Sequence, residues 1–378
     1  MENNVKRVKV GLIVGKMVGG GVESVLLDML RYIDNNKYSF DFIVDSDSTL
    51  VPEKTISELG GRVIYIPPYQ DIFRYMWKMY HLFKKENYTI VHANISAMNV
   101  FPLFVASSCS IPIRIAHNHN LIAPGAGIVK NTTKKLLSNF NNIFANYRIA
   151  PTNATGKWMF RKLPFDVVSN GIDAKKFCFS VNSRNKIRNE FGINGNELLI
   201  GSFGRIVKLK NIPFVISVFQ NVLRKNKDAR LLLIGDGPEK EHIKELIASK
   251  GFMNNKVIFL DSQENIEEFY SALDVYLFPS SAEAFGMAAV EAQMSGLMTY
   301  VSMGVPDEAK ISGKLFRRIV QYDAHIWGAS ILGDMDKLSN RYLISKSLVQ
   351  DNKLASTKMA LKVEKIYDRA VLKYEQEG

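Results

Sequence analysis

Glu283 and Glu291 are the two acidic residues whose spacing and setting best suit the binding of a polyhydroxyl ligand. An apolar run at 274–278 predicts a strand before them, and the turn at 279–281 predicts a loop that holds Glu283. Glu291 then lies about two helical turns further on, in a helix whose first N–H groups can meet a phosphate. One carboxylate can accept hydrogen bonds from sugar hydroxyls and the other from a ribose diol. Between them stand Ala284, Phe285, Gly286 and Met287.

Two cations follow the strand expected at 198–203. Arg205 comes directly after Gly204, and Lys210 lies five residues beyond Arg205. At the mouth of a parallel sheet, these two charges can hold a diphosphate and stabilise it as it leaves. Ordinary surface charge is the alternative interpretation of the same two residues.

A glycine loop, Gly19-Gly20-Gly21, lies between the strand expected at 8–14 and the helix expected at 23–32. Glycines allow a backbone to approach a ligand closely, and the N-terminus of the helix offers free N–H groups to an anion. The loop is not a G-x-G-x-x-G sequence, so a dinucleotide site is not expected. A flexible turn is the alternative interpretation.

Two histidines, His117 and His119, follow the strand expected at 113–116. In an extended chain, residues two apart face the same side. A zinc pair would need further ligands, and none is evident in the sequence. Backbone groups at the end of the strand offer an alternative way to satisfy both rings. The metal-binding pattern D-x-D also occurs at 45–47, but three-residue matches are common by chance, and no metal site is expected there.

Apolar runs alternate with amphipathic helical patterns along most of the chain, and this rhythm restarts after Phe177. The alternation predicts parallel sheets with right-handed crossovers, and the two series predict two doubly wound α/β domains. A chain of 378 residues is long enough for two cores. We expect domains at 1–167 and 168–355, and a helix at 356–378 that packs back on the first domain. Further strands are expected at 40–44, 62–66, 89–92, 147–150, 230–234, 256–260 and 298–302.

The composition is that of an ordinary globular protein, with 47% hydrophobic and 23% charged residues. No apolar run reaches the roughly 18 residues that a membrane span needs, and the N-terminal residues do not resemble a signal peptide. Two cysteines, Cys109 and Cys178, do not make a disulfide framework. These features predict a cytosolic protein.

The net charge of +12 predicts an anionic partner. From Asn87 to Phe165 there is no Asp or Glu, while Lys and Arg recur. The segment 130–147 within it predicts a helix with apolar residues on one side and lysines nearby. This helix either faces the core or lies on anionic lipid at the inner face of a membrane. Nucleic acid is the less favoured partner, because no binding motif accompanies the charge.

These motifs, in their order and spacing, resemble the retaining GT-B glycosyltransferases of family 4. The resemblance covers nearly the full length, and it is strongest to enzymes of bacterial capsular and exopolysaccharide assembly. It includes the glycine loop, the turn at 169–173, Gly204-Arg205 with Lys210, the run at 234–238 and the E-x7-E segment. Two departures are Gly296-Leu297-Met298, which lacks the usual proline, and Asn211 in place of a glycine after Lys210. Asn tolerates positive φ better than most residues do.

The resemblance implies two facing Rossmann-like domains with a deep cleft, an acceptor-binding first domain and a donor-binding second domain. Arg205 and Lys210 would bind the donor diphosphate, Glu283 the transferred sugar and Glu291 the nucleotide ribose. The family also places a histidine toward the sugar, and either His117 or His119 fits that role. The remaining donor contacts implied are Gly20, Gly21, Gly204, Gly237, Ala284, Phe285, Gly286 and Met287.

The implied reaction moves a sugar, with retention, from a nucleoside-diphosphate sugar to a hydroxyl of a saccharide or lipid-linked acceptor. The base is expected to be uridine, and neither a metal nor another cofactor is implied, because cations and helix N–H groups stabilise the leaving diphosphate. Closure around the turn at 170–173 would exclude water. A non-catalytic, nucleotide-sugar-binding partner of another transferase and a sugar-nucleotide epimerase on the same architecture are the alternatives.

Overall fold

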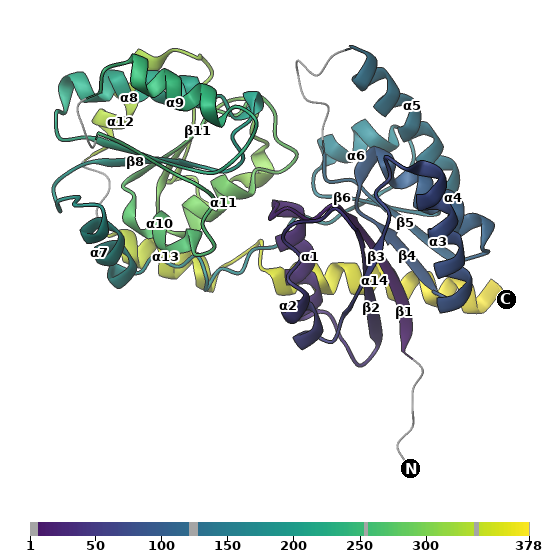
Figure 1. The fold of residues 1–378 in the computed structure, drawn as a ribbon. Coiled ribbons are helices and arrows are strands. Elements are labelled where there is room, and N and C mark those ends of the chain that lie inside the picture. Colours follow the sequence, from purple (N-terminus) through teal and green to yellow (C-terminus); the bar gives the residue numbers. More distant parts are fainter. Residues whose placement is uncertain (1–6, 121–127, 253–255, 336–339, 378) are drawn as a thin grey trace. The chain divides into compact units, whose positions relative to one another are not determined.

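The computed structural model describes residues 7–120, 128–252, 256–335 and 340–377. The chain divides into two compact units, one formed by Met1–Ile172 with Leu354–Gly378 and the other by Asp173–Lys353 (Figure 1). Each unit contains its own sheet, and the two are described separately below. Within the described residues, no helix is long and apolar enough to cross a membrane.

The N-terminal unit is built on a parallel sheet with the strand order β3-β2-β1-β4-β5-β6-β7. Its apolar runs form the strands because side chains on both faces of the sheet are buried beneath helices. The strands are β1 (Val8–Gly15), β2 (Tyr38–Asp45), β3 (Arg62–Ile66), β4 (Ile90–Ala93), β5 (Ile113–His117), β6 (Tyr147–Ala150) and β7 (Asp166–Val167).

Helices cover both faces of this sheet. On one face α3 and α4 pack over a core that includes Ile43, Val91 and Ala116. On the other face α1 and α14 pack together, and Tyr367 of α14 reaches the sheet beside Phe40. The helices are α1 (Gly21–Tyr32), α2 (Glu53–Glu58), α3 (Ile72–Glu86), η1 (Ser96–Asn99), α4 (Val100–Ser108), α5 (Ile128–Phe144), α6 (Asn153–Phe160) and α14 (Ser356–Glu377).

The C-terminal unit has a second parallel sheet, with the order β10-β9-β8-β11-β12-β13. Its strands are β8 (Leu199–Phe203), β9 (Arg230–Ile234), β10 (Val257–Leu260), β11 (Val275–Phe278), β12 (Met298–Val301) and β13 (Phe316–Arg318). The helices around it are α7 (Val181–Glu190), η2 (Lys208–Lys210), α8 (Ile212–Lys225), α9 (Lys240–Ser249), α10 (Ile266–Ala272), α11 (Met287–Met294), η3 (Asp307–Ala309), α12 (Ala324–Gly333) and α13 (Arg341–Gln350).

Both sheets reverse their strand order at one point. The neighbours there are β1 and β4 in the N-terminal unit, and β8 and β11 in the C-terminal unit. Loops that follow such a pair leave in opposite directions, so a crevice opens beyond the carboxyl ends of the two strands. The glycine loop follows β1, Arg205 follows β8 and Glu283 follows β11. The candidate residues of each unit therefore lie where an open α/β sheet binds ligands.

The predicted doubly wound architecture is confirmed, and the larger strands lie where the apolar runs placed them. Two short strands, β7 and β13, were missed. Tyr147 was included both in the expected helix at 130–147 and in the expected strand at 147–150, and it begins β6, because α5 ends at Phe144.

The division between the units falls after Ile172 rather than at 167/168. Ile172 stays with the N-terminal unit because it pairs with Ala355 in a parallel bridge just before α14. Gly171 approaches Ser356 so closely that a Cβ atom there would lie 2.6 Å from the Ser356 Cα. The two chain segments that pass between the units are thus held side by side at this end of the N-terminal unit.

Candidate functional site

A charged pair lies at the switch point of the C-terminal unit. Nζ of Lys210 lies 2.7 Å from Oε1 of Glu283, and both side chains are mostly buried. The ammonium group also lies over the ring of Phe278, 4.4 Å from its centroid. Burial of both charges is tolerated because each neutralises the other. The structure therefore brings together a cation and a carboxylate that lie far apart in the sequence.

Backbone hydrogen bonds hold the two loops that carry this pair. The N–H of Ser281 donates to the carbonyl of Leu209 at 2.9 Å, which joins the loop after β11 to η2. The N–H of Glu283 donates to the carbonyl of Gly304 at 2.8 Å. Asn211 ends η2 with a φ of 53°, the positive value that the sequence suggested for this position. The side chains of Lys210 and Glu283 are thus placed by a fixed backbone.

Arg205 lies in the loop directly after β8 and its neighbour Gly204. Its side chain is exposed, and no described residue pairs with the guanidinium. A cation without a carboxylate partner at a switch point remains available to an anionic ligand. Arg205 and Lys210 therefore differ, since only Lys210 has an acidic partner in the structure.

Two glycines allow the Arg205 loop to pack closely on the next one. Gly235 and Gly237 have φ values of 151° and 155°. A Cβ atom on Gly237 would lie 2.3 Å from the carbonyl oxygen of Ile206, and one on Gly235 would lie 1.9 Å from that of Gly204. Ile206 also donates its N–H to the carbonyl of Asp236 at 2.7 Å. Gly237, which was expected to contact the nucleotide-sugar donor, thus packs against Ile206, the residue after Arg205.

Glu291 lies on α11, which begins at Met287 after Gly286, a residue with a φ of 93°. Phe285 is 2% exposed, so it anchors the start of this helix in the core. The hydroxyl of Tyr270 donates to Oε2 of Glu291 at 2.9 Å. Burial raises the pKa of the Glu291 carboxyl, and the Tyr270 hydrogen bond opposes that rise. Tyr270 was not identified from the sequence.

The glycine loop of the N-terminal unit is closed by a buried glutamate. Oε1 of Glu23 accepts from the N–H of Val18 at 2.9 Å, and Oε2 accepts from the N–H of Gly19 at 2.8 Å. The N–H groups of Gly20 and Gly21 are bonded to no described residue. The two glycines expected to approach phosphate therefore keep free donors at the start of α1.

Three histidines, two of them predicted, gather where β4 and β5 end. Nε2 of His92 lies 3.2 Å from Nδ1 of His117, and Nδ1 of His92 lies 2.7 Å from the hydroxyl of Tyr367. The rings of His117 and His119 are 3.9 Å apart, and Nε2 of His119 lies 3.0 Å from Oδ1 of Asn94. Burial lowers the pKa of His92 and of His119 to about 3, and that of His117 well below its usual value. All three rings are therefore neutral near pH 7.

His92 was missed although its position offered a signal. It lies near the end of one expected strand, as His117 does, and β4 and β5 are paired neighbours in the sheet. Tyr367 gave no such signal, because it lies 275 residues further along the chain, in α14. Its contact with His92 depends on the return of that helix to the N-terminal unit.

Metal-ligand geometry is not found in the described part of the chain, where no group of three or more His, Cys, Asp and Glu side chains is placed to share an ion. In the D-x-D segment, Asp45 is 1% exposed, and burial raises its pKa to about 6. Asp47 instead pairs with Lys16 at 2.7 Å. The two carboxylates of the segment thus have separate environments.

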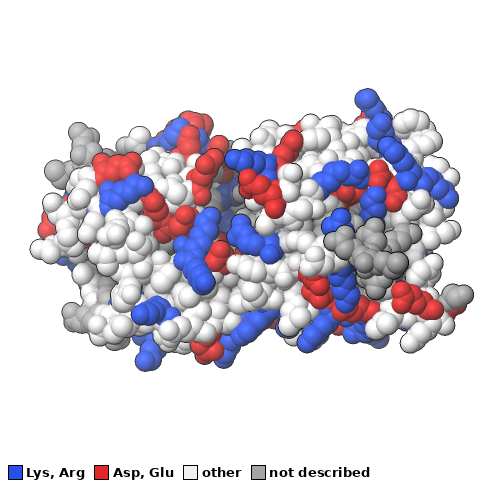
Figure 2. Space-filling model, turned by 90° about the horizontal axis from the view of Figure 1, so that it is seen from below, with Lys and Arg blue, Asp and Glu red and all other residues white. Residues whose placement is uncertain are grey.

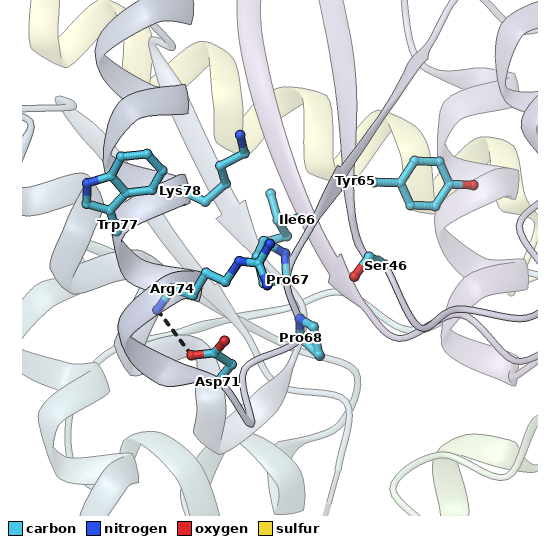
Figure 3. A pocket seen from close by; sticks show the side chains of 9 residues that line it. All are labelled: Ser46, Tyr65, Ile66, Pro67, Pro68, Asp71, Arg74, Trp77 and Lys78. Atoms are coloured by element: carbon cyan, nitrogen blue, oxygen red, sulfur yellow. Dashed lines mark hydrogen bonds between the residues drawn. The ribbon is translucent and has the colours of Figure 1, made fainter.

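A pocket of about 440 Å³ opens beyond β2 and β3, beside the first turns of α3 (Figure 3). Arg74, Trp77 and Lys78 line it from α3, and the Arg74 side chain extends toward Ile66 and Pro67. The other lining residues are Ser46, Tyr65, Pro68 and Asp71. This cationic and aromatic concavity was not identified from the sequence.

Comparisons with known proteins agree with this architecture. Residues 183–313 match the family described as glycosyl transferases group 1, and residues 19–176 match glycosyltransferase family 4. The chain is 25% identical over 330 residues to EpsF of Bacillus subtilis (strain 168), whose name assigns it to the glycosyltransferases; the match covers 84% of this chain and 85% of EpsF.

A second relative is the Escherichia coli UDP-Gal:alpha-D-GlcNAc-diphosphoundecaprenol alpha-1,3-galactosyltransferase, which is 22% identical over 320 residues, 80% of this chain and 81% of that protein. Among solved structures, Anabaena HepE in complex with UDP and glucose superposes with a TM-score of 0.80 at 17% identity, covering 96% of this chain and all of HepE. WaaG, a glycosyltransferase of lipopolysaccharide biosynthesis, superposes with a TM-score of 0.73 at 14% identity, over 94% and 99% of the two chains. The superpositions show the GT-B fold, and the two family matches, with relatives named as glycosyltransferases over most of the chain, show that it belongs to the family 4 glycosyltransferases.

Proposed function

We propose that this glycosyltransferase moves a hexose, with retention of configuration and without a metal ion, from a UDP-sugar to a saccharide or lipid-linked acceptor of bacterial surface polysaccharide assembly. The observation that carries the proposal is the Lys210–Glu283 pair at the switch point of the C-terminal unit, where the loop after β8 also carries Arg205, a cation with no acidic partner among the described residues. The name of the Escherichia coli galactosyltransferase supports the donor and acceptor classes, and the HepE complex with UDP-glucose supports the donor class.

In this proposal the C-terminal unit binds the donor. Arg205 and Lys210 neutralise the diphosphate, and N–H groups at the start of α11 add to them. Glu283 accepts hydrogen bonds from the sugar once Lys210 turns to the phosphate, and Glu291 accepts from the ribose. Ala284, Phe285, Gly286 and Met287 line the approach to α11. The N-terminal unit offers polar groups of its own to a sugar or a phosphate, namely the N–H groups of Gly20 and Gly21 and the histidines.

The proposed reaction breaks the bond between the anomeric carbon and the diphosphate oxygen. The acceptor hydroxyl forms its new bond on the same face of the sugar, and its proton passes to the departing diphosphate. The growing negative charge is stabilised by Arg205 and Lys210, which is why the proposal needs no metal. Glu283, released from Lys210, acts as a hydrogen-bond acceptor for the sugar, not as the nucleophile of a retaining glycosidase.

The acceptor side of the proposal rests on the charge and exposure of the N-terminal unit. Phe73 and Trp77 on α3 are 87% and 60% exposed, and Trp77 lines the pocket of Figure 3 together with Arg74 and Lys78. Exposed aromatic rings with cations suit contact with an anionic membrane surface. On α5, Leu136, Phe140 and Ile143 are also exposed, whereas the side chains of Lys130 and Lys134 lie outside the described residues. In the view of Figure 2, positive and negative side chains are interspersed, without the broad basic patch that nucleic acid binding uses.

A transfer assay tests the function. The protein is incubated in EDTA with UDP-glucose, UDP-galactose or UDP-N-acetylglucosamine and a panel of saccharide and undecaprenyl-diphosphate acceptors, and UDP release and product are measured. The expected result is transfer from one UDP-sugar, with an α-linked product by NMR. Epimerised UDP-sugar without transfer, or nucleotide binding without turnover, would instead assign the chain to one of the two alternative functions. Activity that EDTA abolishes would contradict metal independence.

A further inference from the structure

A chain of hydrogen bonds joins α14 to the histidines at the end of β5. The hydroxyl of Tyr367 meets Nδ1 of His92, and Nε2 of His92 meets Nδ1 of His117. Tyr367 and His92 are fully buried, and His117 is 4% exposed. Nε2 of His117 has no partner among the described residues, although it is buried. The chain of hydrogen bonds therefore ends at Nε2 of His117, a buried atom without a partner among the described residues.

The direction of this chain follows from the phenol. Within the described structure, His92 is the only partner of the Tyr367 hydroxyl. If His92 donated to Tyr367, the phenol proton would be left buried without an acceptor, which is unfavourable. The phenol therefore donates to Nδ1 of His92. A neutral imidazole with an acceptor at Nδ1 carries its proton on Nε2, so His92 donates in turn to Nδ1 of His117. His117 must then carry its own proton on Nε2.

In the neighbouring ring of His119, the nitrogen without a partner among the described residues is an acceptor instead of a donor. The amide nitrogen of Asn94 donates to the carbonyls of His92 and Ile13, which orients Oδ1 toward His119. Nε2 of His119 therefore donates to that oxygen, and Nδ1 of His119 is left as a lone pair. This Nδ1 atom is also buried, and no described residue pairs with it. One ring thus offers a donor and the ring beside it offers an acceptor, which is the complement of a hydroxyl group.

We propose that Tyr367 and His92 are positioning residues that hold His117 with its proton on Nε2, from which His117 donates a hydrogen bond to a sugar hydroxyl. His119 supplies the acceptor for the proton of that hydroxyl. The burial that keeps all three rings neutral preserves these tautomers near pH 7. The role of His117 toward the sugar rests on the proposed function, whereas the tautomers are a property of the protein alone.

Imidazole nitrogen NMR tests the tautomers directly. In protein labelled with 15N-histidine at pH 7.5, the spectrum of His117 is expected to show a protonated Nε2 and an unprotonated Nδ1. Signals are assigned by the loss of one ring in His117→Gln and in His92→Gln. Tyr367→Phe removes the hydrogen that His92 accepts, and is expected to turn His117 into a mixture of tautomers. Protonated Nδ1 in the wild-type His117, or a His117 spectrum unchanged in Tyr367→Phe, would overturn the proposal.

Tyr38→Phe is the matched control, because Tyr38 is also buried under α14 but donates its hydroxyl hydrogen bond to Asp368, and among the described residues it makes no hydrogen bond or ring contact with a histidine. Its His117 spectrum is expected to equal that of the wild type. A changed His117 spectrum in both Tyr→Phe variants would show a general response to loosening of α14. It would also overturn the proposed role of the Tyr367–His92–His117 hydrogen bonds.

Steady-state kinetics test the consequence for the sugar. Tyr367→Phe is expected to lower kcat about tenfold and to leave the dissociation constant of UDP unchanged, because UDP lacks the sugar. His92→Gln keeps an amide donor for His117 and is expected to retain more activity than His92→Leu. Equal losses in the two His92 variants would contradict the positioning role. If the wild type showed no transfer at all, the proposed function would fail. The NMR result would still decide whether Tyr367 and His92 fix the tautomer of His117.

Discussion

Nζ of Lys210 and Oε1 of Glu283 lie 2.7 Å apart, so the carboxylate is paired with the cation that we propose for the donor phosphate. Under this proposal, a diphosphate must compete with Glu283 for Lys210. Arg205, which has no acidic partner among the described residues, can meet the ligand first. Binding of the donor would then exchange one ion pair for another and release Glu283 toward the sugar. Removal of the Glu283 charge should therefore have opposite effects, strengthening the binding of UDP and slowing the transfer of sugar.

Glu283→Gln is expected to bind UDP more tightly than the wild type and to transfer sugar more slowly. Loss of a partly buried competing charge corresponds to about fivefold in affinity, and loss of an acceptor that acts on the sugar to about 100-fold in kcat. Titration calorimetry and the UDP-release assay measure the two effects. Glu245→Gln, an exposed position on α9, is the control for the change in net charge. Weaker UDP binding in Glu283→Gln would refute the competition.

Glu291 is expected to discriminate the ribose hydroxyls of the nucleotide. Glu291→Gln keeps an oxygen for the Tyr270 hydroxyl, so the packing of α11 is retained. The variant should bind UDP about tenfold more weakly, since a hydrogen bond to a charged acceptor is lost. Its affinity for 2′,3′-dideoxy-UDP should equal that of the wild type. A similar loss for both nucleotides would place Glu291 away from the ribose.

Gly237 is expected to be essential for the loop that carries Arg205. With a φ of 155° and a carbonyl oxygen 2.3 Å from the site of a Cβ atom, Gly237→Ala must displace the backbone of Ile206. We expect a loss of about 2 kcal/mol in the free energy of unfolding, measured by urea titration, together with weaker UDP binding. Gly195→Ala, where a Cβ atom meets nothing within 4 Å, serves as the control. Equal stability of the two variants would contradict the close approach.

The buried histidines predict a loss of stability in acid. An unfolded histidine binds a proton below about pH 6.5, whereas folded His92 stays neutral down to about pH 3. Between these values the unfolded state binds more protons, so the free energy of unfolding falls as the pH is lowered, by about 1.4 kcal/mol per pH unit for each histidine.

His92→Gln isolates one of these contributions, because the other titrating groups are common to both proteins. The wild type should exceed the variant in stability by about 2 kcal/mol more at pH 8 than at pH 5. Urea unfolding at the two pH values measures this difference. A difference that does not change with pH would mean that His92 binds a proton as readily in the folded protein as in the unfolded one.

The sequence predicted what depends on local pattern. Strands such as β3, β6 and β9 were placed residue for residue, because an apolar run between turns has few other interpretations. The strands β7 and β13 were missed because two or three residues carry no period. Candidate residues such as Glu283 and Lys210 were found through their order in the chain. That order could not show that they form an ion pair.

Side-chain partners that come from distant elements could not be predicted from the sequence. Tyr270 bonds Glu291 from α10, and Tyr367 bonds His92 from α14. Neither tyrosine differs in local pattern from an ordinary core residue. Glu23 closes the glycine loop through hydrogen bonds to backbone N–H groups, which leave no trace in composition. Contacts of this kind depend on which elements the fold brings together.

The central claim is a metal-free donor site in the C-terminal unit, and nucleotide binding tests it most directly. Titration calorimetry with UDP, GDP and ADP in EDTA should show binding of UDP, weakened in Lys210→Ala and in Glu291→Gln. Binding of GDP or ADP in place of UDP would keep the site and correct the base. Failure of a folded sample to bind any of the three nucleotides would contradict the account.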